Sequence, residues 1–279
     1  MEKVFAARWP EASSMTGVRL AATVILARSP FEVYLTRRSA RSSFAPDAFV
    51  FPGGTVDPQD ALPAVQLRTL GLNDARLRDE FRATVDASLS SSEPPIGPAQ
   101  GAALLVAALR ELFEEAGVLL ARNAAGNLVS TSSVEGLDEE RVAVRTNALP
   151  FGDFLARHDW YADAATLALF SHWITPPIEP RRYNTHFFFA LAPSSQDPLA
   201  DAHETHDGIW IAPSDALERY GRGTMHLVYP TIKHLERLRA FASADEAADY
   251  ARRKRVLTIM PNAPKDGDFK IPAALENVW

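Results

Sequence analysis

Three glutamates stand close together in the stretch LRELFEEAGVLL, which covers residues 109–120. On a helix, Glu111 and Glu115 would share one face, and Glu114 would lie beside them. Like charges at this spacing repel one another, and a position near the end of a helix adds an unfavourable interaction with the helix dipole. Arg110 is the one cation within the stretch that could offset them. A hard divalent cation such as Mg²⁺ takes oxygen ligands, so the pattern indicates metal binding, with a solvated acidic edge as the alternative.

A helix over residues 101–116 is expected to carry these carboxylates. Its apolar side chains recur at helical spacing and form a stripe on the side away from the glutamates. Gly117 follows directly and is a natural helix stop. The stripe consists of Leu105, Ala108, Leu109, Leu112 and Ala116.

The preceding sequence predicts the parts that must meet this helix. Residues 20–28 and 31–37 have the pattern of a strand hairpin. The apolar run 49–51 ends at Pro52-Gly53-Gly54, which indicates a tight turn. Residues 60–92 are rich in Arg, Asp, Ala and Leu, and they predict one or two surface helices in a solvated insertion.

The remaining chain continues to alternate between strand and helix patterns. The absence of an internal repeat or a clear linker predicts one α/β domain. Strands are expected over 166–174, 183–192 and 208–212, and helices over 137–148, 151–157, from 213 onward and over 230–241.

Composition excludes several classes of function. The 279 residues contain no cysteine, so disulfides, thiolate catalysis and zinc–thiolate sites are ruled out. The net charge of −6 gives no reason to expect a nucleic-acid partner. No secretory leader or membrane span is recognisable, because the most apolar early stretch, 17–27, is too short to cross a bilayer. We therefore expect a cytoplasmic protein without a membrane partner.

The glutamate stretch resembles the second half of the Nudix hydrolase box, G-x5-E-x7-R-E-U-x-E-E-x-G-U, in which U is aliphatic. Residues 110–118, RELFEEAGV, match every fixed position of that half, and Pro52-Gly53-Gly54 is similar to the start of the box. Asp60 stands where the family has its first glutamate, and Asp57 is a competing candidate for that position. Between Asp60 and Arg110 there are 49 residues, far more than the seven of the box.

A box interrupted in this way resembles the coenzyme A diphosphatase-like branch of the family. Further similarity lies in LTRRS at 35–39, HWITP at 172–176, RRYNTHFF at 181–188 and HET at 203–205, and in all the resemblance covers about residues 18–240. It implies a Nudix-type α/β/α sandwich with a mixed sheet. The whole chain, 1–279, would form a single domain with an inserted helical segment at about 61–98 and a C-terminal helical extension at about 230–279.

The resemblance also implies a reaction, which is Mg²⁺-dependent hydrolysis of a nucleoside diphosphate derivative. Coenzyme A or an acyl-coenzyme A would yield 3′,5′-ADP and a phosphopantetheine. Another nucleotide such as ADP-ribose or NADH is an alternative substrate, and Mn²⁺ is an alternative metal. A nucleotide-sensing domain with little turnover is a further alternative, which Asp60 in place of glutamate keeps open. The expected partner is a small-molecule nucleotide, and a homodimer is left open.

Site roles follow from the same resemblance. Arg110 would orient a glutamate, and Glu114 or Glu204 would act as the general base. Gly53 and Gly54 would form the turn against the substrate. The expected metal ligands are Glu111, Glu114, Glu115 and Asp60, and the expected substrate-binding cations are Arg37, Arg38, Arg181 and Arg182. The histidines His172, His186, His203 and His206 are expected to be structural rather than metal ligands.

Overall fold

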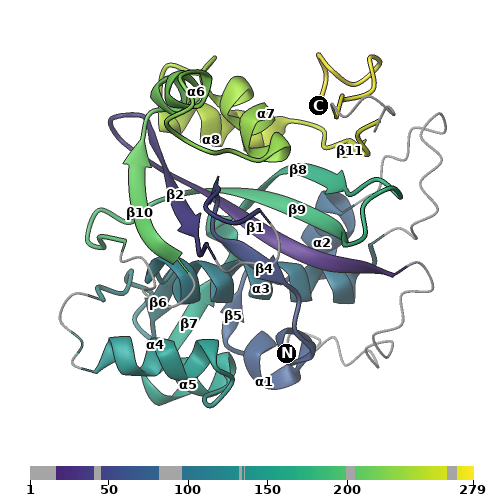
Figure 1. The fold of residues 1–279 in the computed structure, drawn as a ribbon. Helices are drawn as coiled ribbons and strands as arrows, with labels where there is room; N and C mark the ends of the chain where they lie inside the picture. Colours follow the sequence, from purple (N-terminus) through teal and green to yellow (C-terminus); the bar gives the residue numbers. More distant parts are fainter. Residues whose placement is uncertain are drawn as a thin grey trace.

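An eight-stranded mixed sheet lies in the middle of the computed structural model (Figure 1). The structure describes residues 17–40, 45–81, 96–131, 134, 136–198, 205–262 and 269–279, with the side chains of 205–207 excepted. The strand order is β10-β2-β1-β9-β8-β11, with β3 paired to β2 and β4 paired to β1. The strands are β1 (Val18–Arg28), β2 (Glu32–Arg38), β3 (Phe49–Val50), β4 (Gly53–Thr55), β8 (Ala168–Ile174), β9 (Arg182–Leu191), β10 (Thr205–Ile211) and β11 (Thr258–Ile259).

A gap between β1 and β2 determines where the glycine turn lies. The two strands pair directly only near their hairpin, at Ala27↔Val33 and Arg28↔Glu32. Farther along, β3 pairs with β2 and β4 pairs with β1, so the segment between β3 and β4 fills the gap. The Val24 N–H donates to the Pro52 carbonyl at 2.8 Å and holds this segment in the sheet. Gly53 and Gly54 are therefore embedded in the sheet rather than lying on an outer loop.

The sheet is covered by helices on both faces, as Figure 1 shows. Successive residues of β1 belong to different buried clusters, because side chains on a strand alternate between faces. Ala22 and Val24 pack in the cluster that includes α3, whereas Ile25 and Ala27 pack in the cluster with the C-terminal helices. The predicted α/β/α sandwich is confirmed. One face carries α3 (Pro98–Ala116) and the other carries α6 (Pro213–Gly221), α7 (Tyr229–Leu238) and α8 (Ala244–Arg253).

The predicted glutamate-bearing helix is confirmed as α3, which starts three residues earlier than expected. Proline occupies its first position, where no backbone N–H is needed. Gly117 ends it in the left-handed conformation with φ of 66°, and the Gly117 N–H donates to the Phe113 carbonyl at 2.9 Å. Nearly all of α3 is buried, because the sheet covers one side and a second layer covers the other.

That second layer contains a small three-stranded sheet and further helices. Phe113 of α3 stacks on Phe154 with ring centroids 4.8 Å apart, which joins α3 to this layer. The strand order is β5-β7-β6. Its elements are α1 (Pro63–Gln66), β5 (Thr69–Leu70), β6 (Ala121–Asn123), α4 (Leu137–Arg145), α5 (Phe151–Arg157) and β7 (Trp160–Asp163).

The expectation that residues 60–92 form a solvated insertion is wrong for the part that the structure describes. Leu77, on α2 (Asp74–Glu80), is fully buried, and Val65 and Phe81 are nearly so. Phe81 packs so closely on Gly101 of α3 that a Cβ at Gly101 would come within 2.6 Å of its ring. Charge concealed this packing in the sequence, because Arg76 and Glu80 of α2 pair with each other at 2.8 Å beside the buried leucine. Residues 82–95 lie outside the described residues.

The C-terminal region adds a strand that the sequence patterns did not predict. After α7 and α8 the chain forms β11, which pairs in parallel with β8 at Thr258↔His172. Within the described parts of the chain, no helix combines the length and the apolar character needed to cross a membrane. The assignment of 61–98 as an insertion and of 230–279 as an extension stays a prediction.

The packing of α2 leads to a stability prediction with a matched control. Leu77→Ala should lower the free energy of unfolding by about 2–5 kcal/mol, because it leaves a cavity in a packed core. Leu67→Ala should change it by less than about 0.5 kcal/mol, because Leu67 is 62% exposed. Urea unfolding of both variants would measure the difference, and equal effects would show that α2 is not part of the core.

Candidate functional site

The glycine turn and the end of α3 meet at a single place. The Gly53 N–H donates to Glu115 Oε2 at 2.9 Å. A Cβ on Gly54 would lie 2.4 Å from Glu111 Oε1, and one on Gly53 would lie 2.4 Å from the Ala22 carbonyl oxygen. A side chain at position 53 would clash with the backbone of β1, and one at position 54 would displace the Glu111 carboxylate, so the close approach of strand β4 to α3 depends on these two residues.

Arg110 lies at the centre of this site and is almost fully buried. Its guanidinium binds Asp60 through two bonds, Nε to Oδ1 at 2.8 Å and Nη2 to Oδ2 at 2.9 Å. Nη1 donates to Glu111 Oε1 at 2.9 Å and to Glu114 Oε1 at 3.1 Å. Nη2 also reaches the Thr55 carbonyl oxygen at 3.3 Å. The predicted orienting role of Arg110 thus has a geometric basis, and it extends to two glutamates.

The structure separates the roles of the two aspartates that compete for the upstream position. Asp60 is 1% exposed and lies in a short 3-10 helix, η1 (Pro58–Ala61). Its Oδ2 also accepts the Asp57 N–H at 2.8 Å, whereas Asp57 Oδ1 caps the same helix by accepting the Gln59 N–H at 2.9 Å. Asp60 is therefore the partner of Arg110, and Asp57 is a helix cap. Both oxygens of Asp60 thus accept hydrogen bonds, two of the three from Arg110.

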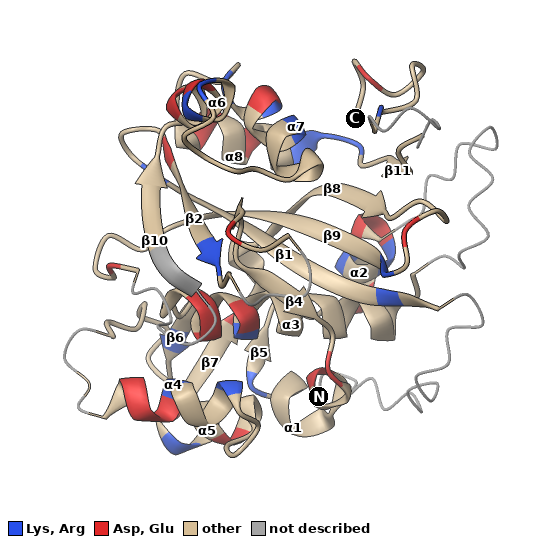
Figure 2. Ribbon diagram, viewed as in Figure 1, with Lys and Arg blue, Asp and Glu red and all other residues tan. Residues whose placement is uncertain are grey.

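Four carboxylates lie close together at this site. Asp60, Glu111 and Glu114 pair with the Arg110 guanidinium, and Glu115 accepts the Gly53 N–H beside them. Burial raises the pKa of Glu111 to about 7, Arg110 opposes the rise, and the neighbouring Glu114 charge adds to it. In Figure 2 the C-terminal turns of α3 form a concentrated red segment below the sheet. A divalent cation would relieve the repulsion between such closely spaced buried carboxylates.

The carboxylate oxygens of this site are the kind of ligand that a divalent cation binds. The side chains, however, are not gathered around one point. Among the described residues, no three acidic or histidine side chains converge as they would around a bound metal. Arg110 draws Glu111 and Glu114 toward itself, and the Gly53 N–H holds Glu115. Glu114 and Glu115 are 7% and 8% exposed, so the oxygens that a hard cation prefers lie side by side in a largely dry place.

The predicted substrate arginines do not all come to this place. Arg182 pairs with Val18, five residues along β1 from the Thr23 that faces Gly53, which is a separation of ~16 Å. Its Nε donates to the Thr175 carbonyl at 3.0 Å, and its neighbour Arg181 is exposed. This pair therefore lies away from the glutamates.

The other predicted arginine pair lies at the end of β2. Arg37 forms a half-exposed ion pair with Asp47 at 3.2 Å. Arg38 is the last residue of β2 and pairs with Thr205 at the start of β10. Figure 2 shows this blue end of β2 directed toward the red turns of α3. Glu204, the weaker candidate for the base, lies outside the described residues.

Tyr34 is a buried core residue whose electrostatic coupling to Glu115 the sequence patterns did not reveal. Burial raises its pKa to about 12, while the charges of Arg141 and Glu115 act on it with opposite signs. Its hydroxyl therefore lies within electrostatic reach of Glu115. Gly208 packs against that hydroxyl so closely that a Cβ there would come within 1.8 Å of it. A tyrosine within an apolar strand is most simply interpreted as core, so nothing local in the sequence marks it.

Two of the histidines expected to be structural have that role. His172 stacks on His186 with ring centroids 4.1 Å apart. His172 contacts Asn184 Oδ1 at 2.6 Å and Thr258 Oγ1 at 2.9 Å. Burial lowers the pKa of His172 to about 4, against the opposing effect of Asn184. His203 and the side chain of His206 lie outside the described residues.

Comparisons with known proteins identify the relatives of this chain. A family model described as the NUDT19 Nudix domain matches residues 5–238. Two acyl-coenzyme A diphosphatases named NUDT19 are similar to it. The Xenopus laevis protein is 29% identical over 238 residues, which is 78% of this chain and 62% of that protein. The Gallus gallus protein is 31% identical over 268 residues, which is 85% of this chain and 70% of that protein. The match with the Xenopus laevis protein thus spans less than two thirds of that relative's length.

A solved structure supports the fold as well. The crystal structure of a NUDIX hydrolase from Alicyclobacillus acidocaldarius superposes with a TM-score of 0.67 and 28% sequence identity. The match covers 85% of this chain and 97% of that one. The resemblance drawn from RELFEEAGV and the glycine turn is thereby confirmed.

The buried pair between Asp60 and Arg110 leads to a second stability prediction. Asp60→Asn should lower the free energy of unfolding by about 1.5–3 kcal/mol, because it replaces the carboxylate that accepts two bonds from the buried guanidinium and leaves only Glu111 and Glu114 as its charged partners. Asp47→Asn removes the same charge from a half-exposed pair and should cost less than about 1 kcal/mol. Chemical unfolding without added metal separates this effect from metal binding, and similar losses in both variants would contradict the assignment.

The lowered pKa of His172 predicts a pH dependence. The unfolded chain takes up a proton on this histidine near pH 6.5, whereas the folded chain does so only near pH 4. The unfolded state therefore binds more protons in this window, and stability should fall as the pH drops from 6.5 toward 4, by up to ~3 kcal/mol from this group. Urea unfolding between these pH values would show a shallower slope in His172→Gln. His226 is exposed, so His226→Gln should keep the wild-type slope. An unchanged slope in His172→Gln would contradict the prediction.

Proposed function

Because this chain belongs to the NUDT19 Nudix domain family, we propose that it hydrolyses the diphosphate linkage of a nucleotide. We take coenzyme A or an acyl-coenzyme A as the substrate, with 3′,5′-ADP and a phosphopantetheine as the products. The names of the Xenopus laevis and Gallus gallus relatives support this choice. The observation that carries the reaction type is the group of glutamates on α3, which Arg110 and the Gly53 N–H hold at the glycine turn.

In this proposal Glu111, Glu114 and Glu115 would hold Mg²⁺, with Mn²⁺ as a substitute. The bound ion would neutralise diphosphate oxygens and make a water molecule more acidic. Asp60, predicted above as a fourth ligand, would act at least by holding Arg110, since two of the hydrogen bonds that it accepts come from that guanidinium. Arg110 in turn orients Glu111 and Glu114 and limits the repulsion between them.

Glu114 is the best-supported candidate for the general base. Its carboxylate is 8% exposed and is fixed in orientation by Arg110 at 3.1 Å. In that position it would take the proton from the attacking water, and its low exposure would keep bulk water from competing. Glu204 remains the weaker candidate for this role.

The phosphate groups of the substrate require cations at the edge of the site. We assign this role to Arg37 and Arg38 at the end of β2, because one guanidinium group can donate two parallel hydrogen bonds to a phosphate. The half-exposed Arg37–Asp47 pair could open at little cost when a substrate arrives. Arg181 and Arg182 are less suited to the reacting diphosphate, because the register places them ~16 Å along the sheet.

A hydrolysis screen tests the function directly. The full chain with Mg²⁺ should cleave coenzyme A and acyl-coenzyme A in preference to ADP-ribose, NADH and dinucleoside polyphosphates. Mass spectrometry should detect 3′,5′-ADP, which identifies the broken bond. Preference for ADP-ribose or NADH would support the alternative substrate class. Binding of a nucleotide without turnover would support the sensing alternative.

Variants of the glutamates test the site. Glu114→Gln and Glu115→Gln should each lower Mg²⁺-dependent kcat on the order of 100-fold or more, because each removes a charged ligand. Glu139→Gln removes an exposed carboxylate of α4 and should leave the rate unchanged. Thermal unfolding would check that each variant is folded. Full activity in both Glu114→Gln and Glu115→Gln would rule out the metal role.

A further inference from the structure

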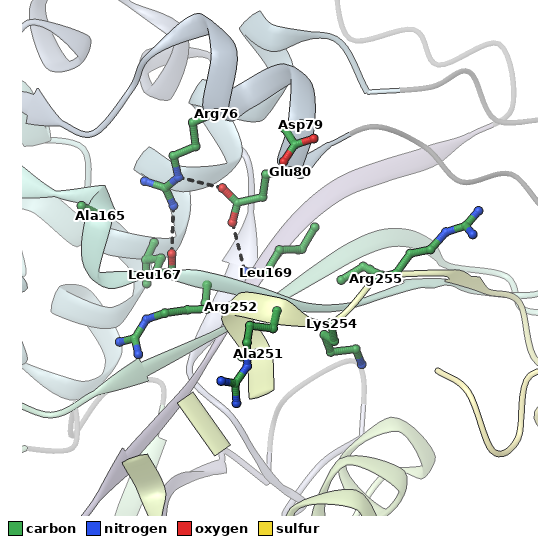
Figure 3. Close-up of a pocket in the computed structure, with 13 residues that line it drawn as sticks. Arg76, Asp79, Glu80, Ala165, Leu167, Leu169, Ala251, Arg252, Lys254 and Arg255 are labelled. Atoms are coloured by element: carbon green, nitrogen blue, oxygen red, sulfur yellow. Dashed lines mark hydrogen bonds and ion pairs between the residues drawn. The ribbon is translucent and has the colours of Figure 1, made fainter. Parts of the chain in front are cut away.

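A cavity of about 790 Å³ lies on another part of the molecule, between α2, the start of β8 and the end of α8 (Figure 3). A volume of this size is typical of small-molecule sites. Its lining contains five cations, Arg76, Arg252, Arg253, Lys254 and Arg255, against the two acids Asp79 and Glu80. The lining thus has a formal charge of +3 in a chain whose net charge is −6. This concentration of positive charge favours an anionic ligand.

On one wall of the cavity, the charged side chains Arg76 and Glu80 already have hydrogen-bond and ion-pair partners. Arg76 pairs with Glu80 and donates to the Ala164 and Leu167 carbonyls at 2.9 and 2.8 Å. Glu80 also accepts the Leu169 N–H at 3.0 Å. Figure 3 shows the bonds of this group to Leu167 and Leu169, which tie α2 to the start of β8. These groups shape the wall, so a ligand would be held by the cations opposite.

The opposite wall presents cations that could bind a ligand. Arg253 and Arg255 are exposed, and neither forms an ion pair with any residue that the structure describes. Arg252 pairs with Asp249 at 3.0 Å, with both side chains more than half exposed, so this contact is weak. Cations at the end of α8 also offset the helix dipole, but the dipole accounts for neither the cavity nor the facing wall.

Lys254 adds a buried cation that lacks a hydrogen-bond acceptor. Its Nζ is buried and has no acceptor among the described residues. It lies 4.7 Å from the ring centre of Phe170, 5.2 Å from that of Tyr250 and 5.7 Å from that of Trp279. Burial lowers the pKa of Lys254 to about 7, and the charge of Arg237 adds to the effect. This ammonium is enclosed by the rings, so it adds positive charge beside the cavity without itself contacting a ligand.

The directions of the side chains narrow the class of ligand. In Figure 3 Arg252 and Arg255 extend to opposite sides rather than toward a common point. In these directions the two guanidinium groups suit a ligand with separate anionic groups better than a single phosphate ion. Leu167, Ala168 and Val256 add apolar surface that an aromatic base could cover. We propose that this cavity binds a nucleotide with two separate phosphate groups, of the nucleoside 3′,5′-bisphosphate class, at a site apart from the glutamates of α3.

The fold separates the two sites. Phe81, which directly follows α2, packs on Gly101 near the start of α3, whereas Glu111 lies ten residues farther along, or ~15 Å. The proposed binding goes beyond the proposed hydrolysis and does not require it. The two can therefore fail independently in experiments.

Calorimetry on the full chain in EDTA, with 3′,5′-ADP as the probe, tests this proposal. The double variant Arg253→Glu/Arg255→Glu should bind roughly tenfold more weakly or worse, because charge-assisted contacts are lost. Arg253→Gln/Arg255→Gln should weaken binding less and guards against a folding defect. Arg239→Glu reverses an exposed charge outside the cavity, and Glu114→Gln alters only the glutamate site, so both should bind as wild type does.

Further measurements locate the ligand and define its chemistry. Hydrogen exchange should show protection of residues 251–256 on addition of 3′,5′-ADP, and inorganic phosphate should bind much more weakly. The proposal is overturned if the probe does not bind, if both double variants bind as wild type does, or if Glu114→Gln abolishes binding. Phosphate binding as tight as that of 3′,5′-ADP would also overturn it. So would binding to phosphatidylglycerol vesicles in place of the nucleotide, which would indicate a membrane surface.

Discussion

The buried guanidinium of Arg110 is the constraint on which the rest of the site depends. A charged group removed from water is tolerated only when its donors are paired, and here every nitrogen of the guanidinium has a carboxylate partner. Those partners come from η1 and from α3, and a further bond reaches the Thr55 carbonyl of β4. One side chain therefore joins three segments and fixes the directions of two glutamates. The geometry of the carboxylates is a consequence of this pairing.

The arrangement of the strands brings the glycine turn up to the carboxylates that Arg110 holds. Because β1 and β2 diverge, β3 and β4 enter the gap and bring Gly53 and Gly54 onto the end of α3. A Cβ at Gly53 would clash with the backbone of β1, and a Cβ at Gly54 would push the Glu111 carboxylate away, so both glycines keep the turn close to α3. The Gly53 N–H then offers a donor to Glu115 at the end of a helix where the dipole disfavours an anion. The turn thus stabilises a charge that the helix alone would destabilise.

Features that depend on neighbouring residues could be predicted from the sequence, whereas features that depend on contacts between distant residues could not. The existence of α3, its stop at Gly117 and the grouping of its glutamates are local, and the sequence pattern predicted them, although the helix starts three residues earlier than expected. The choice between Asp60 and Asp57 depends on a contact across 50 residues, which no spacing rule contains. Tyr34 reads as core because only the tertiary fold places Glu115 near its hydroxyl. Leu77 is hidden among charges that pair with one another, so its burial could not be inferred.

The long segment between the two halves of the box is compatible with an intact site because both of its ends are anchored. At the first end, Asp60 is held by the Asp57 N–H and by Arg110. At the second, Phe81 packs on Gly101 and so fixes the start of α3 relative to α2. The entropy of closing a loop grows only with the logarithm of its length, so lengthening the connection costs little once its ends are fixed. The same anchoring places Arg76 and Glu80 against the end of α8, so the segment that interrupts the box also builds one wall of the cationic cavity.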